Sequence, residues 1–463
     1  MAATQLSRLD TAFLSLDSDS TPMNIGAVAL FAPQQPIHPA RIADLLRSRV
    51  ERIPRLRQRV RPSLWPPVAQ WVNDHRSDPA DHIHAHHLPR PHDASQLTER
   101  VAEIMAERLD PDRPLWEIHV ITGLPGGWFA VLPKLHHALA DGAGALTLGM
   151  GLLDGFDGTA VVPKQRQPEG LGMREMLADL GSSAQQALDI AGSVLRSARP
   201  APQASPLLAT GAGGRRTLAT VRLDMHDIKR VRKRHGGTTN DVLLAVLSGA
   251  LREWFLARGD QPDSLALRAL VPVSQRCRSR GASQAGNQLS GYLCDLPVAE
   301  PDPVRRLAAV RAMMDGNKEA GPGRGPGALP LLADRLPSAL HRVVMPMVGQ
   351  CAPLLCDTVV TTVPLPSLPL TFDGATLREV YPVVPLAPGH ALGVAFSPYR
   401  GTVHVGLHAN AEALPDVDML ASALSGTLGE LTEMCAGEGR EHSTHLPTSP
   451  DQYAALAGSD RSR

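Results

Sequence analysis

The chain has 463 residues, 43% of them hydrophobic and 20% charged, which is typical of a globular protein with two domains rather than one core. Lysine plus arginine equals aspartate plus glutamate at 46 each, so charge gives no reason to expect binding to nucleic acid. The five cysteines form no CxxC pattern, and neither a signal peptide nor an apolar run of about 18 residues is present. We therefore predict a cytoplasmic protein whose contact with any membrane is peripheral.

Residues 1–160 predict a first unit of mixed helices and strands. Residues 27–31 predict a short strand, and residues 39–52 and 97–109 predict amphipathic helices. Residues 115–135 predict a hairpin of two largely apolar strands around a Leu-Pro-Gly-Gly turn. Such strands are typical of the centre of a sheet.

Two stretches of this unit resemble binding sites but have plainer interpretations. Arginines alternate with other residues over 55–61, so a strand there would have one basic face, either for phosphates or anionic lipid or as a solvated edge. Four histidines within residues 82–87 resemble a metal-binding tract, although the prolines that follow favour an exposed edge strand.

The segment from Leu135 to Gly142 carries the clearest chemistry. Side chains alternate along a strand, so His136 and His137 should point to opposite faces of the sheet. A neutral imidazole can take a proton from a hydroxyl, with Asp141 to orient it and backbone N–H groups near Gly142 to stabilise an oxyanion. Buried structural histidines are an equal alternative, and a metal site is not expected because no HExxH spacing or nearby cysteine occurs.

Residues 161–216 are rich in proline and glycine, and we interpret them as a crossover linker with one helix over 173–197. Residues 217–436 then form a second unit of helices and strands. The polar tail, residues 437–463, is expected to be disordered.

The second unit follows the same alternation of elements. Its predicted helices cover residues 226–235, 239–257 and 419–431, and its predicted strands cover residues 217–223, 265–273, 358–363, 390–396 and 402–408.

Two residues of the second unit are candidates for the site. Asn240 lies in the first turn of the long helix, where the ordinary role is capping. Arg276 follows the strand over 265–273 and is a candidate partner for Asp141 across the domain junction.

The motif HHxxxDG resembles the active-site signature of the CoA-dependent acyltransferase superfamily, which includes chloramphenicol acetyltransferases and peptide-synthetase condensation domains. Further stretches resemble one branch, the bacterial wax ester synthase/acyl-CoA:diacylglycerol acyltransferase family, in that family's order. They are residues 6–13, 113–117, 239–242, 271–274, 286–287, 381–383 and 389–392.

The resemblance implies an α/β (α+β) fold of two chloramphenicol-acetyltransferase-like domains with mixed sheets and a tunnel at their junction. It implies acyl-CoA as co-substrate without a further cofactor, and diacylglycerol or a long-chain alcohol as acceptor, giving triacylglycerol or wax ester at a membrane or lipid droplet. His137 would be the proton acceptor, helped by His136, Asp141 and Gly142, and Asn240 would face the catalytic centre. The sequence contains no GxSxG elbow, so a covalent acyl-enzyme is not expected.

One loop departs from the family's pattern. Where the family has Asn-Val-Pro-Gly-Pro, this chain has Thr-Val-Pro-Leu-Pro at residues 362–366, which removes an amide and a glycine that could contact substrate.

Two alternative functions stay open: a condensation-type enzyme that uses a carrier-protein thioester, and a non-catalytic lipid-binding relative. The intact His137 and Asp141 count against the second. Acyl length, acceptor and oligomeric state stay open.

Overall fold

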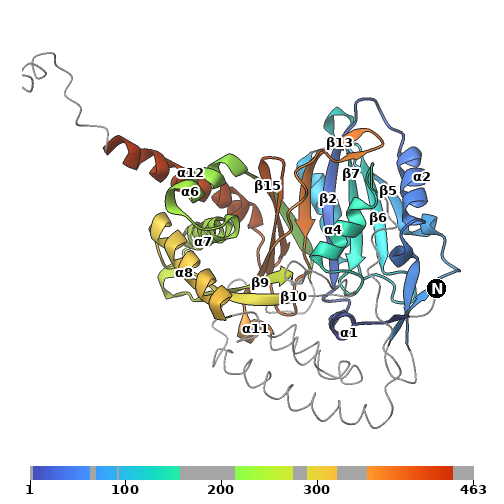
Figure 1. The fold of residues 1–463 in the computed structure, drawn as a ribbon, viewed down its shortest axis with the longest axis horizontal. Coiled ribbons are helices and arrows are strands. Elements are labelled where there is room, and N and C mark those ends of the chain that lie inside the picture. The colour runs from blue at the N-terminus through green and yellow to red at the C-terminus, as the bar shows by residue number, and fades with distance from the viewer. Residues whose placement is uncertain are drawn as a thin grey trace, which may run out of the picture.

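The computed structural model describes residues 4–62, 69–90, 93–156, 214–274, 289–320 and 352–441, and it has two six-stranded sheets that meet in the middle of the molecule (Figure 1). The expected α/β (α+β) fold with two mixed sheets is confirmed. The helix predicted over residues 173–197, nearly all of the linker, Arg276 and most of the tail lie outside the described residues.

The N-terminal sheet has the strand order β12-β13-β2-β7-β6-β5, and all its neighbours are antiparallel except β5 and β6. Its strands are β2 (Asn24–Ala32), β5 (Ile83–His87), β6 (Trp116–Thr122), β7 (Phe129–His136), β12 (Thr371–Phe372) and β13 (Ala375–Val383). Around it lie α1 (Arg8–Leu16), α2 (Pro39–Val50), α3 (Ala94–Ala106) and α4 (Gly142–Met150), and a small sheet of β1 (Thr4–Gln5), β4 (Gln70–Asn73) and β3 (Gln58–Arg61). Apolar residues of α2 and α4 share one core with one face of this sheet, while α3 packs on the opposite face.

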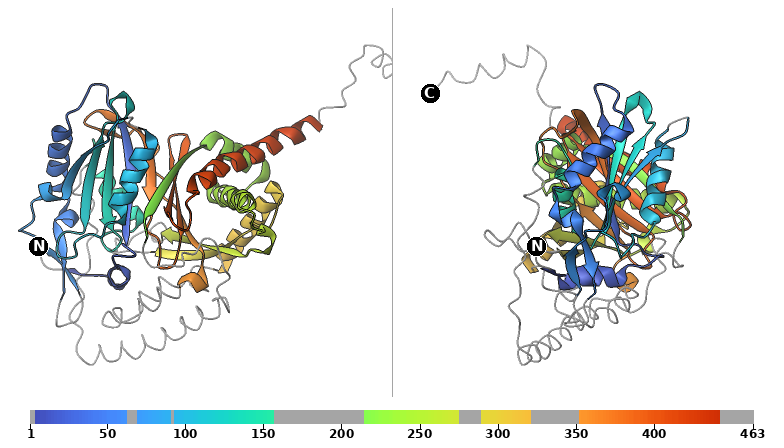
Figure 2. Two further views of the ribbon diagram at one scale, coloured as in Figure 1. Left: turned by 180° about the vertical axis from the view of Figure 1, so that it is seen from behind. Right: turned by 90° about the vertical axis from the view of Figure 1, so that its right-hand side faces the viewer.

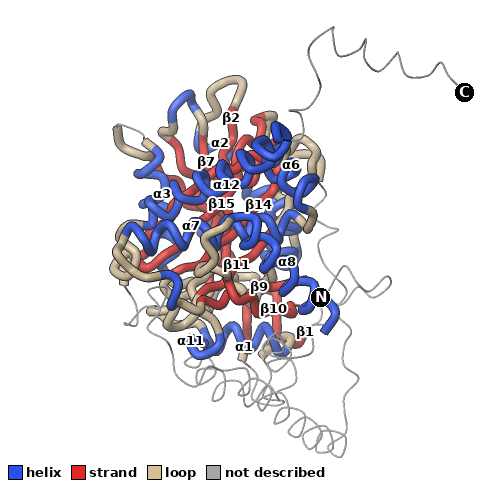
Figure 3. Tube along the Cα trace, turned by 90° about the vertical axis from the view of Figure 1, so that its left-hand side faces the viewer, coloured by secondary structure: helices blue, strands red, loops and turns tan. Residues whose placement is uncertain are grey.

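The C-terminal sheet has the order β10-β9-β11-β14-β15-β8, in which β11 runs parallel to both its neighbours. Its strands are β8 (Arg216–Asp224), β9 (Leu267–Ser274), β10 (Leu289–Leu296), β11 (Thr358–Thr362), β14 (Leu392–Tyr399) and β15 (Thr402–Asn410). The helices of this half are α6 (Met225–His235), α7 (Thr239–Ala257), α8 (Pro303–Ala320), α11 (Ala352–Leu355) and α12 (Val417–Glu441). Figures 2 and 3 show α6, α7, α8 and α12 gathered on the side of this sheet away from the N-terminal half.

The boundary between the two halves differs from the one that the sequence predicts. The sequence places residues 371–383 in the second unit, but β12 and β13 lie at the edge of the N-terminal sheet, where β13 pairs with β2. The reason is that strand pairing depends on partners more than 300 residues away, which local periodicity cannot reveal. The chain therefore returns to the first half after building most of the second.

Two smaller predictions also need correction. Residues 54–57 form a short 3-10 helix, so the alternating arginines do not make one continuous strand, and β3 begins only at Gln58. Helix α12 runs to Glu441, past the boundary predicted at residue 436. The hairpin of β6 and β7, the capped helix α7 and the hairpin of β14 and β15 are confirmed. No helix within the described ranges has the length and apolar character needed to cross a membrane.

Candidate active site

The histidine pair lies at the end of β7, as the hydrophobic run before it predicts. The N–H of His137 donates to the carbonyl of Met23 at 2.8 Å and the N–H of His136 to that of Leu115 at 3.0 Å, so sheet-like bonding continues through both residues. The alternation of a strand therefore separates their side chains. His137 lines a cavity, while His136 is 1% exposed on the other side.

His136 is fixed in one tautomer by its neighbours. The N–H of Ala138 donates to Nδ1 of His136 at 3.0 Å, so that nitrogen carries no proton and Nε2 does. Nε2 lies 3.6 Å from the carboxylate of Asp17, which also accepts from the Met23 N–H and from Arg108. Burial by itself raises the pKa of Asp17, but its interaction with His136 and the hydrogen bonds from Met23 and Arg108 hold it below its usual value. His136 thus braces the strand end and does not face the cavity.

His137 is held by a stacked aromatic ring. Phe13 of α1 lies 3.9 Å from it between ring centroids, at an interplanar angle of 21°. The imidazole is half-buried, and its removal from water lowers its pKa to about 4, although contact with its own backbone and the charge of Asp141 act in the opposite direction. His137 is therefore neutral at physiological pH, which is the form that can accept a proton.

Asp141 organises the first turn of α4. Its carboxylate accepts from the N–H of Gly144 at 2.7 Å, and its carbonyl accepts from the N–H of Ala145 at 2.7 Å. It is the N-cap of the helix and is fully buried. The remaining amides of this turn belong to Gly142 and Ala143, and both residues line the cavity beside His137.

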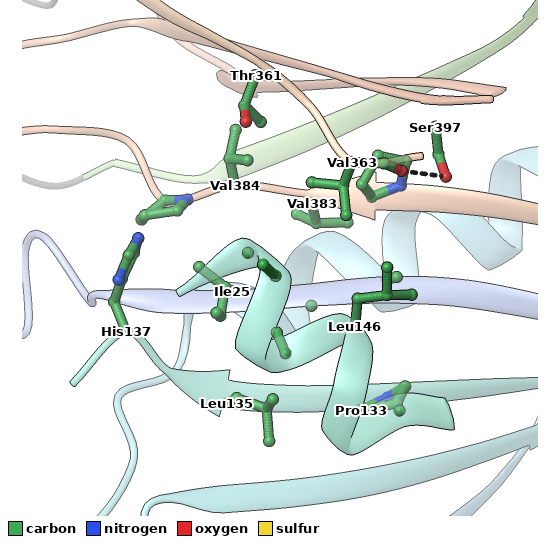
Figure 4. A pocket seen from close by; sticks show the side chains of 18 of the residues that line it. Ile25, Pro133, Leu135, His137, Leu146, Thr361, Val363, Val383, Val384 and Ser397 are labelled. Atoms are coloured by element: carbon green, nitrogen blue, oxygen red, sulfur yellow. Dashed lines mark hydrogen bonds between the residues drawn. The ribbon is translucent and has the colours of Figure 1, made fainter. Parts of the chain in front are cut away.

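The cavity has a volume of about 660 Å³ and draws its walls from both halves of the molecule. Strands β2 and β7 and helix α4 contribute one side, and β9, β11 and the segment after β13 contribute the other. In Figure 4, Leu135 and Leu146 lie on one side and Thr361 and Val384 on the other, with His137 at one end of the view. Nearly all the described lining residues are apolar, which suits a hydrocarbon chain.

The loop that departs from the family's pattern forms part of this wall. Residues 362–365 line the cavity, and Ser397 donates from its hydroxyl to the carbonyl of Val363 at 3.0 Å. The loop therefore offers the cavity mainly apolar side chains.

The structure does not bring every predicted residue to the site. Asn240 is exposed in the first turn of α7, where Thr238 and Asp241 form a capping box, and it is not among the residues that line the cavity. Sequence reasoning does not identify Phe13 and Asp17 as site residues. The resemblance of residues 6–13 to the family is the only signal for Phe13.

The histidines at 82–87 belong to the edge strand β5 and the short helix before it, and they find protein partners. His82 bonds through Nδ1 to the carbonyl of Trp116 at 2.9 Å, and His86 bonds to His119 at 3.0 Å. In the described part of the chain, no group of three or more His, Cys, Asp or Glu side chains is arranged to hold a metal ion.

The two mixed sheets that meet at one junction form a fold shared with condensation domains. The starter condensation domain of rhizomide synthetase aligns with a TM-score of 0.57 at 16% identity over 94% of both chains. A wax ester synthase/diacylglycerol acyltransferase from Marinobacter aquaeolei aligns with a TM-score of 0.71 at 25% identity, covering 94% of this chain and all of that one.

Sequence comparison identifies one family among the proteins that share this two-sheet fold. The family model for the wax ester synthase/diacylglycerol acyltransferase catalytic domain matches residues 6–243, and that for the C-terminal domain matches residues 285–432. A Mycobacterium tuberculosis protein named "Probable diacyglycerol O-acyltransferase tgs1" is 32% identical over 92% of this chain and 95% of its own. The chain belongs to the wax ester synthase/diacylglycerol acyltransferase family, and it is an acyltransferase.

Proposed function

We propose that the protein transfers the acyl group of an acyl-CoA to the hydroxyl of diacylglycerol, with long-chain alcohols as a second acceptor. The observation that carries the proposal is a neutral His137 at an apolar cavity walled by both sheets. The names of the Marinobacter and Mycobacterium relatives support these substrates. In the proposal acyl-CoA is a co-substrate, no other cofactor or metal takes part, and the cavity is the inner part of a tunnel at the junction.

His137 would act as a general base in one displacement. As its imidazole takes the hydroxyl proton, the acceptor oxygen attacks the thioester carbonyl and a C–O bond forms. The tetrahedral intermediate then expels the CoA sulfur by breaking the C–S bond, and the imidazolium gives its proton to the departing thiolate. Proton and charge balance without an acyl-enzyme.

The start of α4 is the proposed oxyanion site. The amides of Gly142 and Ala143 are at the positive end of the helix dipole, and the Asp141 cap leaves them available by using those of Gly144 and Ala145 instead. Arg276 stays a prediction as a contact of substrate or of Asp141. Asn240 does not line the cavity, so it stays a prediction only for a part of a substrate that lies outside the cavity.

Peripheral contact with the inner membrane or a lipid droplet, from the cytoplasmic side, belongs to the same proposal. Phe156 and Leu368 are exposed, and a hydrogen bond of 2.9 Å from the N–H of Asp154 to the carbonyl of Thr371 joins their segments. These segments adjoin Leu153 and Leu365 of the cavity wall. These exposed apolar side chains could thus contact a lipid phase.

The test is release of CoA from palmitoyl-CoA, with diacylglycerol and hexadecanol offered separately. We expect His137→Ala to lower kcat/KM by about 10²-fold to 10⁴-fold with either acceptor, the usual contribution of a general base. His136→Ala should reduce stability more than the chemical step, because His136 contacts Asp17 and the Ala138 amide.

Near-wild-type turnover in a folded His137→Ala protein would contradict the assignment. If the wild type releases no CoA, transfer from an acyl carrier protein would instead favour the condensation-type alternative. Lipid binding without any transfer would favour the non-catalytic one.

A further inference from the structure

We infer that the part of the cavity between α4 and strands β13, β2 and β7 is a closed arm that receives the acyl chain and measures it at about 16 carbons. We call it the acyl arm. The inference rests on the proposed function for the identity of the chain, but its geometry is independent of the chemistry at His137.

The floor of the acyl arm is a ladder of three paired strands. Leu135 pairs with Ile25 at the catalytic end, and Val131 pairs with Ala29 further along. On the other edge of β2, Ala29 pairs with Val380 of β13, and all five residues line the cavity. Because every second residue faces the same side, the ladder leads away from His137 as a continuous apolar surface.

Helix α4 forms the roof. In Figure 4 it runs over the same strands away from His137, with Leu135 nearer to the histidine than Leu146 and Pro133. Its lining residues include the small Gly142, Ala145 and Gly149, which leave the space below the helix open. A Cβ placed on Gly149 would meet no atom within 4 Å.

Large side chains close the far end. Phe31 at the end of β2, Phe372 of β12 and Leu46 of α2 line the cavity there, and all three are almost fully buried. Phe31 and Phe372 lie 5.9 Å apart between ring centroids, and Phe129 packs against both. Such a cluster resists displacement, so a chain that reaches it must stop.

The length of the arm follows from strand geometry. From the Ile25 position to the Phe31 position β2 advances six residues, or about 20 Å at about 3.3 Å per residue. An extended alkyl chain advances about 1.3 Å per carbon, given a C–C bond of about 1.5 Å. The arm therefore accommodates about 16 carbons, the length of a palmitoyl group.

The volume agrees with one long chain. A cavity of about 660 Å³ holds about 20 groups the size of a water molecule, and a methylene is of similar size. One chain of about 16 carbons and the reacting ends of two substrates fill it. The alkyl part of an acceptor must therefore extend beyond the cavity that the described residues enclose.

Gly149 offers the sharpest test. It lies seven residues, or about 10 Å, along α4 from Gly142, which corresponds to about eight carbons of chain. In Gly149→Leu the new side chain would enter open space and block the half of the acyl arm that is farther from His137. Thr147→Leu is the matched control, since Thr147 is exposed on the same helix and does not line the cavity.

The experiment measures kcat/KM for octanoyl-, dodecanoyl-, palmitoyl- and eicosanoyl-CoA with one fixed acceptor, and then for a series of alcohols with one fixed donor. We expect Gly149→Leu to lower the ratio of palmitoyl-CoA to octanoyl-CoA by at least about tenfold, while Thr147→Leu leaves it unchanged. Phe31→Ala should raise the ratio of eicosanoyl-CoA to palmitoyl-CoA. An equal loss for all donors would overturn the inference, as would a shift confined to the alcohol series, which would assign the arm to the acceptor.

A binding measurement separates this inference from the proposed function. Calorimetric titration with palmitoyl-CoA and octanoyl-CoA requires no turnover. We expect Gly149→Leu to weaken binding of palmitoyl-CoA about tenfold relative to octanoyl-CoA even if the protein transfers no acyl group. Equal affinities for both ligands in wild type and variant would overturn the inference of an acyl arm while leaving the proposed transfer by His137 intact.

Discussion

At the residue scale, two adjacent histidines receive different surroundings from one strand. His136 points to a buried carboxylate, Asp17, and accepts a backbone hydrogen bond, so its protons are fixed. His137 points to an apolar cavity and stacks on Phe13. The first therefore lies away from the cavity, while the second lines it, as the proposed general base must.

The surroundings of His137 predict an unusual pH dependence. Its pKa is lowered to about 4, so the neutral base is present above that pH and is lost only as pH falls through it. We expect the acidic limb of kcat/KM, which reports the free enzyme, to lie near pH 4 and not near the usual value of about 6.5. Rates should be measured from about pH 4 to about pH 8 at constant ionic strength.

The Asp141 variant sharpens that measurement. The charge of Asp141 raises the pKa of His137, so Asp141→Asn should move the limb to still lower pH while it reduces the rate through loss of the helix cap. An acidic limb at the ordinary pKa of a histidine, about 6.5, in the wild type would contradict the removal of the His137 imidazole from water.

At the element scale, one carboxylate holds the turn of the β12–β13 hairpin, which also joins the N-terminal half through the pairing of β13 with β2. Asp154 accepts from Arg49, from the hydroxyl of Thr371 at 2.8 Å, and from the N–H groups of Asp373 at 3.1 Å and Gly374 at 3.0 Å. These bonds hold the tight turn at the end of β12, beside the far wall of the cavity.

We expect Asp154→Ala to lower the free energy of unfolding by about 2–3 kcal/mol, because several partly buried donors lose their acceptor together. Asp373→Asn is the control. It breaks an ion pair with the exposed Arg41 but keeps a residue that tolerates a φ of 48°, so its cost should be below about 1 kcal/mol. Thermal unfolding of both variants measures the difference, and equal losses of stability would show that Asp154 does not hold the turn at the end of β12.

At the scale of the whole molecule, the two sheets meet where β15 passes β13. A Cβ on Gly406 of β15 would collide with the carbonyl oxygen of Pro382 in β13, so this crossing requires glycine. The same strand β13 contributes Val380, Pro382 and Val383 to the cavity. Strand β13 therefore forms part of both the junction between the sheets and the wall of the cavity.

Gly406→Ala should consequently lower the free energy of unfolding by about 1–3 kcal/mol, the usual cost of overpacking, and should also reduce acyl transfer. Gly429→Ala in α12 is the control, since a Cβ there meets no atom within 4 Å and alanine favours a helix. Chemical denaturation gives the stabilities. Similar values for both variants would mean that the crossing adapts without strain.

Much of this protein can be predicted because its signals are local. The alternation of apolar residues in β6 and β7, the Thr238 cap of α7 and the opposite directions of His136 and His137 each depend on a few neighbouring residues. The order of the resembling motifs likewise indicates the family, because each motif is a short contiguous stretch of chain.

The sequence by itself thus determined most of the described elements, the presence of the histidine motif and the family, because periodicity, caps and motifs lie within short stretches of chain. Only the tertiary structure decided that β13 joins the N-terminal sheet, that Asn240 is exposed and that Phe31 and Phe372 meet at the end of one cavity. Those outcomes depend on packing between segments hundreds of residues apart, and no local pattern specifies which of many apolar surfaces will meet.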